Sequence, residues 1–192
     1  MNNKYFLLRH GQTIYQTEKK DILYPFPEEP PVDLTEKGES QIKEAAKKLK
    51  EKKIDLIFAS DFFRTQKTAK MVAKGCVLPE DRIISDKRLR DLKTGEFRSG
   101  RKEDYQRFFS SAGEKFEKRP PAGENWNDVI NRVADFLNEV ENKHKNKNIL
   151  VVSHGDPLWF LAMTIKGFKT REEFLSERGK ELYPDVGQLI IP

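Results

Sequence analysis

Two short apolar runs, each leading into a histidine and then a glycine, constrain the fold of this chain more than any other feature of its sequence. The first run, residues 5–8, leads to His10, and the second, residues 149–152, leads to His154. Continuous apolar runs of this length are typical of strands that are buried on both faces of a parallel sheet. Because ligands bind outside the carboxyl ends of such strands, the two imidazoles are predicted to converge on one binding edge.

Strand-like and helix-like patterns alternate between and after these runs. Residues 54–59 predict a third buried strand, and residues 186–191 predict a last strand, antiparallel at an edge. Apolar side chains recur at helical spacing at Ile42, Ala45, Ala46 and Leu49, at Trp126, Val129, Ile130, Val133, Leu137 and Val140, and at Leu158, Leu161, Ala162 and Ile165. Thr35 is the expected N-cap of the first helix and Asp156 that of the last, with Pro157 at its first position. The alternation predicts an open α/β sandwich.

The length of 192 residues predicts one domain over residues 1–192, with enough apolar side chains for a core. Two irregular segments interrupt the pattern. Residues 24–32 hold four prolines, which excludes a helix or a central strand there. Residues 93–122 show only one short candidate helix, near residues 105–109. Residues 14–32 and 93–122 are expected to roof the binding edge and to determine specificity.

The charge pattern argues against nucleic acid as a partner. Lys and Arg number 36 and Asp and Glu 31, a formal net charge of +5, but the two signs are interleaved along the chain. The single cysteine, Cys76, cannot form an internal disulfide, which favours a reducing, cytoplasmic compartment. No run approaches the roughly 18 apolar residues of a membrane span, so no membrane partner is expected. The sequence leaves the oligomeric state open, with a homodimer as one option.

The neighbours of the two histidines indicate an anion site. Arg9 precedes His10, and Arg64 is expected on the first turn of the helix that follows the third strand. Guanidinium groups match the oxygens of phosphate, and helix N-termini supply further positive potential. Clustered arginines disfavour an imidazolium, so His10 is predicted to stay neutral and to act as a nucleophile. The third histidine, His144, lies among lysines at a helix end and is given no function.

Two other chemistries fit the sequence less well. A metal site would need at least one further well-placed ligand, and the adjacent arginines oppose a dication, so no metal or other cofactor is expected. The spacing of Cys76 and Arg82 matches the Cys-x5-Arg loop of thiol phosphatases. However, residues 79–81 are Pro-Glu-Asp, which removes N–H donors and puts acids where phosphate would bind. Cys76 is therefore predicted to be a half-buried apolar residue.

Five segments resemble, in order, the motifs of the histidine phosphatase superfamily, the phosphoglycerate mutase-like proteins. They are Arg9-His10-Gly11, Leu34-Thr35-Glu36-Lys37-Gly38, Ser60-Asp61-Phe62-Phe63-Arg64-Thr65 with Thr68-Ala69, Pro121-Ala122-Gly123-Glu124-Asn125 and Val152-Ser153-His154-Gly155. The resemblance covers residues 5–155 and implies a three-layer α/β/α sandwich around a mostly parallel central sheet. It also implies that His10 forms a phosphohistidine, with His154 as the second catalytic histidine. Arg9, Arg64 and His154 would bind the phosphoryl oxygens, and no metal or cofactor would take part.

The resemblance also locates a general acid, in residues 89–97. Many members of the family carry glutamate where this chain has Asp91, and Glu96 is the fallback donor. Glu124 is expected to orient an arginine or a backbone turn. Thr13 is included as a further phosphate ligand, although its hydroxyl could equally cap a turn. Asp156 brings a negative charge near the second histidine, which would weaken phosphate binding unless the helix N-terminus offsets it.

These residues together predict a metal-independent phosphomonoester hydrolase that acts on a small phosphorylated substrate through a phosphohistidine on His10. Two alternatives stay open: a cofactor-dependent phosphoglycerate mutase, and a protein that binds a phosphorylated ligand with little catalysis. The resemblance speaks against the mutase, because the mutases carry longer inserts around the pocket. No rule identifies the substrate from the irregular segments.

Overall fold

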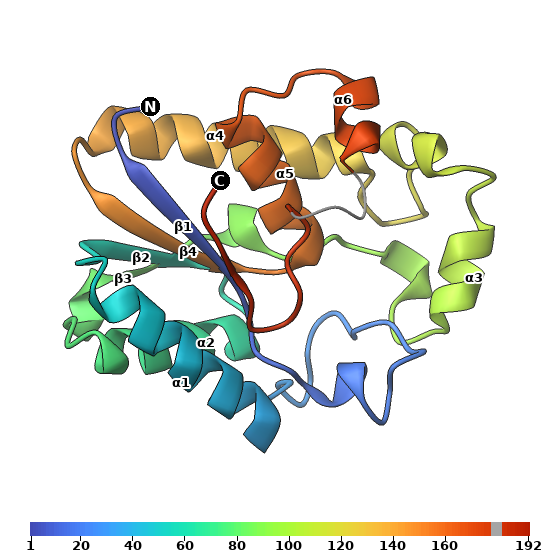
Figure 1. Cartoon of the computed structure of the whole chain (residues 1–192). Helices are drawn as coiled ribbons and strands as arrows, with labels where there is room; N and C mark the ends of the chain where they lie inside the picture. The colour runs from blue at the N-terminus through green and yellow to red at the C-terminus, as the bar shows by residue number, and fades with distance from the viewer. Residues whose placement is uncertain (178–181) are drawn as a thin grey trace.

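A five-stranded sheet lies at the centre of the computed structural model, which describes residues 1–177 and 182–192 (Figure 1). Its strands are β1 (Lys4–Arg9), β2 (Leu56–Ala59), β3 (Ile83–Ser85), β4 (Asn148–Ser153) and β5 (Leu189–Ile190). They lie in the order β3-β2-β4-β1-β5, and all neighbours are parallel except β1 and β5. The sheet confirms the three apolar runs as buried parallel strands and the last strand as antiparallel.

Helices cover both faces of this sheet, so the chain folds into the expected three-layer α/β/α sandwich (Figure 1). One face carries α1 (Glu36–Lys50) and α2 (Phe63–Gly75), and the other carries α4 (Trp126–Lys143) and α5 (Gly155–Ile165). Two shorter helices, α3 (Lys102–Arg107) and α6 (Arg171–Ser176), lie outside these layers.

In strand β1, successive side chains point to opposite faces of the sheet and so enter two different apolar cores. Tyr5 and Leu7 belong to the apolar cluster beneath α4 and α5, whereas Phe6 and Leu8 belong to the cluster beneath α1 and α2. Leu7 and Leu8 are fully buried, and each such side chain contributes about 1.5–3 kcal/mol by leaving water. An apolar run without alternation is therefore what a strand between two helical layers requires.

Side-chain caps mark the start of three of the described helices, α1, α4 and α6. Thr35 accepts a hydrogen bond from the backbone N–H of Gly38 at 3.1 Å, which confirms it as the N-cap of α1. The prediction that Asp156 caps α5 is wrong. The helix begins one residue earlier, at Gly155, with His154 as its N-cap. The side chain of Asp156 instead accepts a hydrogen bond from the hydroxyl of Tyr183 at 3.1 Å.

Several elements differ from the sequence-based expectation. The third strand begins at residue 56 instead of 54, and the short helix expected near residues 105–109 is α3, which begins three residues earlier. Strand β3 and helix α6 were not predicted from the sequence. Strand β3 is short and mostly exposed at the edge of the sheet, so it lacks the apolar run that marks the central strands.

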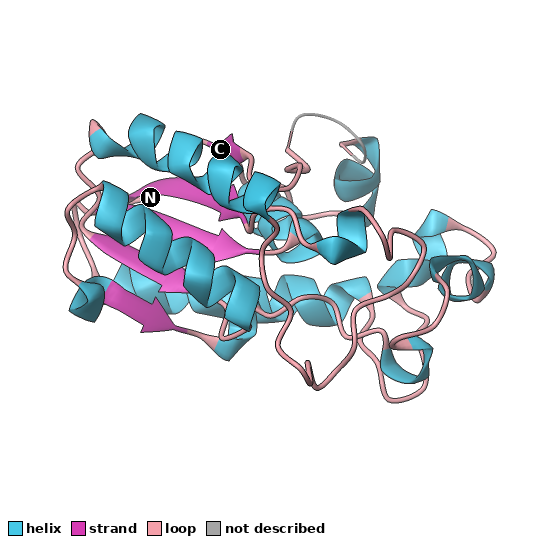
Figure 2. Ribbon diagram, turned by 90° about the horizontal axis from the view of Figure 1, so that it is seen from below, coloured by secondary structure: helices cyan, strands magenta, loops and turns pink. Residues whose placement is uncertain are grey.

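The irregular segments gather beyond the carboxyl ends of the parallel strands, as Figure 2 shows. Residues 10–35 leave β1, and residues 86–125 connect β3 to α4. This placement puts long loops over the edge where the two histidines emerge.

None of the described helices is both long and apolar enough to cross a membrane.

Candidate active site

The two predicted histidines meet at the carboxyl edge of the sheet. His10 directly follows β1, and His154 directly follows β4, the parallel neighbour of β1. The backbone N–H of His10 donates to the carbonyl of Ser153 at 3.1 Å, so the ladder continues to the point where both rings emerge. The ring centroids are 5.3 Å apart, and the residues are 1% and 0% exposed. The register of the sheet therefore brings the pair together.

The His10 ring is held in the tautomer that a nucleophile needs. Its Nδ1 lies 2.8 Å from the carbonyl oxygen of Gly11, an acceptor only, so we assign the proton to Nδ1. Burial lowers the pKa of His10 well below its usual value, and the charges of Arg64 and Arg9 lower it further. The imidazole is thus neutral near pH 7, with its lone pair on Nε2.

Arg64 forms the centre of the anion site. It lies on the first turn of α2, is fully buried, and places Nη2 3.0 Å from Nδ1 of His154. The guanidinium donates there, so the other ring nitrogen, Nε2, carries the proton of the neutral imidazole and donates to Oγ of Ser60 at 3.0 Å. Burial and the charge of Arg64 lower the pKa of His154. Arg64 thereby fixes the orientation of the second histidine.

Aromatic rings and an acid enclose the Arg64 guanidinium. The ring centroids of Tyr24 and Phe62 lie 4.1 and 5.0 Å from its central carbon. Nη1 makes an ion pair with the carboxylate of Glu28, whose side chain is only 7% exposed. Sequence reasoning missed Glu28, which lies in the proline-rich segment, because an acid in an aperiodic loop carries no local signal of its position.

Arg9 supplies a second guanidinium at the same edge. Its Nη1 donates to the carbonyl of Pro184 at 3.1 Å, and the Tyr183 ring lies 5.9 Å from its central carbon. Its buried Nε has no hydrogen-bond partner among the described residues. The prediction of two arginines around the two histidines agrees with this placement.

Asp91 is the carboxylate nearest to these groups among the predicted proton donors. Its Oδ2 lies 3.6 Å from Nη2 of Arg64 and 3.8 Å from Nδ1 of His154, and its side chain is 31% exposed. The fallback donor, Glu96, is exposed and does not line the cavity described below. The structure therefore brings Asp91, and not Glu96, to the histidine pair.

The Thr13 hydroxyl serves the loop instead of facing the histidines. It accepts from the backbone N–H of Tyr15 at 3.2 Å, which caps a short 3-10 turn. It also lies 2.7 Å from the Tyr24 hydroxyl and 3.1 Å from Oε1 of Gln16. Of the two roles considered for Thr13, the geometry favours the cap. Its hydroxyl also bonds to Tyr24, whose ring lies against the Arg64 guanidinium, so Thr13 contributes to the site indirectly.

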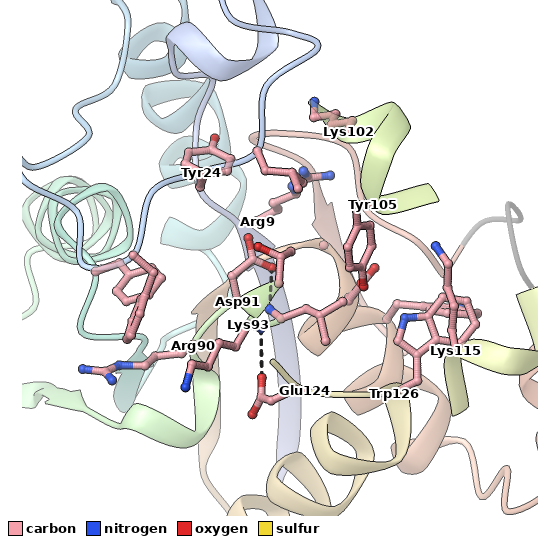
Figure 3. Close-up of a pocket in the computed structure, with 18 of the residues that line it drawn as sticks. Arg9, Tyr24, Arg90, Asp91, Lys93, Lys102, Tyr105, Lys115, Glu124 and Trp126 are labelled. Carbon is pink, nitrogen blue, oxygen red and sulfur yellow. Dashed lines mark hydrogen bonds between the residues drawn. The ribbon is translucent and has the colours of Figure 1, made fainter. Parts of the chain in front are cut away.

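A cavity of about 700 Å³ opens beside these groups (Figure 3). Arg9, Arg64 and Asp91 contribute to its wall, whereas His10 and His154 lie beneath the wall. Aromatic residues form much of the remainder: Tyr24, Phe26, Phe62, Tyr105, Trp126, Trp159 and Tyr183. Residues of both irregular segments thus line the cavity.

Asp156 lines the same cavity, where its charge is disfavoured. Burial raises the pKa of Asp156, and the nearby charge of Asp91 raises it further. Its position within the first turn of α5 stabilises the anion only in part.

No cluster of three or more His, Cys, Asp or Glu side chains suited to a metal ion occurs among residues 1–177 and 182–192.

Comparisons with known proteins agree with this geometry. The sequence profile of the histidine phosphatase superfamily (branch 1) matches residues 5–175. The probable phosphoglycerate mutase GpmB of Cronobacter sakazakii is 33% identical over 175 residues, which cover 88% of this chain and 77% of that protein. The corresponding protein of Escherichia coli K12 is 31% identical over 169 residues, covering 84% and 74%.

Solved structures show the same fold. A mycobacterial glucosyl-3-phosphoglycerate phosphatase in complex with VO3 aligns with a TM-score of 0.74 and 22% identity over 90% of this chain and 84% of that one. The α-ribazole phosphatase of Shigella flexneri aligns with a TM-score of 0.74 and 24% identity over 97% and 88%. At these identities the likeness concerns the fold alone. The profile match and the curated relatives carry the assignment: this chain belongs to branch 1 of the histidine phosphatase superfamily.

Proposed function

We propose that this protein is a metal-independent phosphomonoester hydrolase that works through a phosphohistidine on His10. The observation that carries the proposal is the state of His10: a buried, neutral imidazole whose Nδ1 is tied to a carbonyl, next to the guanidinium of Arg64. A neutral imidazole with a free lone pair is a nucleophile, and the neighbouring cations favour a bound phosphoryl group. A nucleophile beside an anion site fits phosphoryl transfer better than binding alone.

The reaction takes two steps. Nε2 of His10 attacks phosphorus in line, the bond from phosphorus to the leaving oxygen breaks, and Asp91 gives its proton to that oxygen. Water then attacks the phosphohistidine, Asp91 takes a proton from the water, and inorganic phosphate leaves with His10 restored. Arg9 and Arg64 offset the charge of the transferred group, so no step requires a metal.

Trapping of the covalent intermediate tests this proposal. Rapid alkaline quench during turnover of ³²P-labelled phosphomonoester, with alkaline conditions kept throughout the work-up, is expected to leave alkali-stable, acid-labile label on His10. The His144→Gln variant, which changes the chain's third histidine at the far end of α4, should label like the wild type. The His10→Ala variant should not label at all. Phosphate binding without any labelled histidine would instead indicate a phospholigand-binding protein.

The loop that carries Asp91 is held by a clamp of two side chains. Arg132, on α4, donates to the carbonyl of Asp91 at 3.2 Å and also to the carbonyl of Arg88. Glu124 accepts from Arg132 at 3.1 and 3.2 Å. It also accepts from the backbone N–H of Lys93 at 3.0 Å (Figure 3). The expectation that Glu124 orients an arginine or a turn agrees with this network, which fixes the backbone on both sides of Asp91.

Replacing Arg132 with alanine is expected to lower kcat by about 10- to 100-fold, the range typical of residues that orient a functional group. The reason is that the Asp91 loop loses the two hydrogen bonds that Arg132 donates to its carbonyls, so the proton donor is less often in position. The readout is kcat against KM for p-nitrophenyl phosphate. The matched control is Arg119→Ala, which breaks an exposed ion pair with Asp128 at the start of the same helix. An Arg132 variant with unchanged kcat would contradict the positioning role.

A phosphoglycerate mutase is the second candidate, because the curated relatives carry that name. In a mutase the phosphohistidine passes its phosphoryl group to a phosphoglycerate, whereas in a hydrolase it passes to water. ³¹P NMR of 3-phosphoglycerate with the protein, with and without 2,3-bisphosphoglycerate, separates the two. The hydrolase is expected to release inorganic phosphate under both conditions without forming 2-phosphoglycerate.

A further inference from the structure

The carboxylate of Glu28 pairs with the guanidinium fork of Arg64, where the proposed mechanism places the phosphoryl group. We propose that Glu28 is a built-in competitor for this phosphate subsite, and that a ligand must displace it before the ligand can bind. The inference rests on the proposed function only in that Arg64 binds the phosphoryl group. It adds a gate to the site, formed by residues 25–31, the segment that carries Glu28.

The contact between Glu28 and Arg64 is buried on both sides. The side chains of the two partners are 7% and 0% exposed, and Oε1 of Glu28 pairs with Nη1 of Arg64. The second carboxylate oxygen, Oε2, is buried and has no hydrogen-bond partner among the described residues, and neither has Nε of Arg64. A buried carboxylate with one oxygen unsatisfied is poorly compensated for its lost hydration. The pair is therefore a contact that a better-matched anion can replace.

The nucleophile is closed off from the cavity as well. His10 is 1% exposed, and neither His10 nor His154 contributes to the wall of the 700 Å³ cavity. A phosphorus atom must come within bonding distance of Nε2 of His10 for the reaction to occur, so the site has to open before the first step. Movement of Glu28 away from Arg64 frees the guanidinium at the place where the phosphoryl group has to bind.

The segment that carries Glu28 is tied down weakly between firm anchors. We define the gate as residues 25–31. On one side, the Tyr24 hydroxyl bonds to Thr13 and Gln16 at 2.7 and 2.9 Å. On the other side, Asp33 accepts from Lys67 at 2.7 Å.

Within the gate, the contact with Arg64 is the one hydrogen-bonded tie to the described remainder of the chain. The Phe26 ring adds contacts with Phe62, at 6.0 Å between centroids, and with the cations of Arg90 and Lys93. Few backbone hydrogen bonds mark segments that open at low free-energy cost. Loss of one ion pair therefore releases the gate while the rest of the fold stays in place.

A phosphoryl dianion is well suited to displace this carboxylate. It brings two negative charges and three oxygens, which can accept from Arg9 and Arg64 together, whereas Glu28 reaches Arg64 alone. The two anions cannot share the fork, because like charges at contact distance repel strongly in a buried site. The apparent affinity for phosphate is then the intrinsic affinity multiplied by the fraction of molecules in which the fork is free.

Isothermal titration of inorganic phosphate at pH 8 tests the gate without any need for turnover. The Glu28→Gln variant is expected to bind phosphate about tenfold or more tightly than the wild type, because an open state populated at about 10% or less imposes at least that factor. The matched control is Glu29→Gln, which makes the same change of charge one residue away on an exposed side chain. This control should bind like the wild type.

A second variant separates occupancy of the fork from a general effect of charge. E28D keeps the charge but shortens the side chain by one methylene, so its hold on Arg64 weakens and phosphate should bind more tightly than to the wild type. Thermal denaturation confirms that each variant is folded. Equal affinity of wild type, E28Q and E28D would overturn the gate while leaving the proposed function intact. Absence of phosphate binding in all of them, E28Q included, would overturn both.

Discussion

Replacing His10 with alanine is expected to reduce turnover of p-nitrophenyl phosphate by about 10⁴-fold or more, the scale seen when an enzyme loses its nucleophile. The covalent step has no substitute group in the described site, because Nδ1 of the other buried histidine, His154, already accepts from Arg64. Burial and the charges of Arg64 and Arg9 keep the wild-type imidazole neutral and nucleophilic, and an alanine at this position has no nucleophilic group.

The measurement is single-turnover rate against enzyme concentration, with His10→Gln as a second variant that fills the same space. Both variants should retain phosphate binding, because Arg9 and Arg64 remain in place. A His10 variant with wild-type turnover would contradict the assignment of the nucleophile. A variant that unfolds is recognised by its melting curve, and the glutamine variant then carries the test.

The sequence predicted the centre of the molecule well, for physical reasons that are local. A run such as residues 149–152 must be buried, and parallel strands that share a register end at a shared edge, so two strand-end histidines had to meet. Arg64 followed from the same logic, because a helix that leaves a strand end starts at that edge. The alternation of these elements predicted an open α/β sandwich, and the resemblance to the histidine phosphatase superfamily implied its three layers.

The remainder depended on contacts between distant segments. Glu28 lies in an aperiodic loop, and only the folded chain shows that it reaches Arg64, 36 residues away. The clamp between Arg132 and the carbonyl of Asp91 spans 41 residues, and one partner is a backbone atom that no side-chain pattern reports. The wrong cap at Asp156 has a similar origin, since helix α5 starts where β4 and Tyr183 dictate and not where the local signal is strongest.

Removal of the Arg64 side chain gives the second large effect. We expect Arg64→Ala to lower kcat/KM by about 10²- to 10³-fold or more, as removal of one preorganised charge donor typically does. Two consequences add to the loss of phosphate contact. His154 loses the donor that fixes its Nδ1, and Glu28 is left as a buried carboxylate without its partner. Removing one partner of a buried ion pair is destabilising, so the variant is expected to be less stable as well as slower.

Two further variants isolate the role of the guanidinium. Arg64→Lys keeps the charge but not the fork, so it should recover only part of the activity, because one ammonium cannot serve His154 and a phosphoryl group with fixed geometry. Lys70→Ala removes an exposed cation from the same helix and should leave kcat/KM unchanged. If lysine restored full activity, the field of the charge would suffice and the bidentate geometry would not matter. If the alanine variant kept wild-type kcat/KM, the phosphoryl group would have to bind elsewhere than in the fork of Arg64.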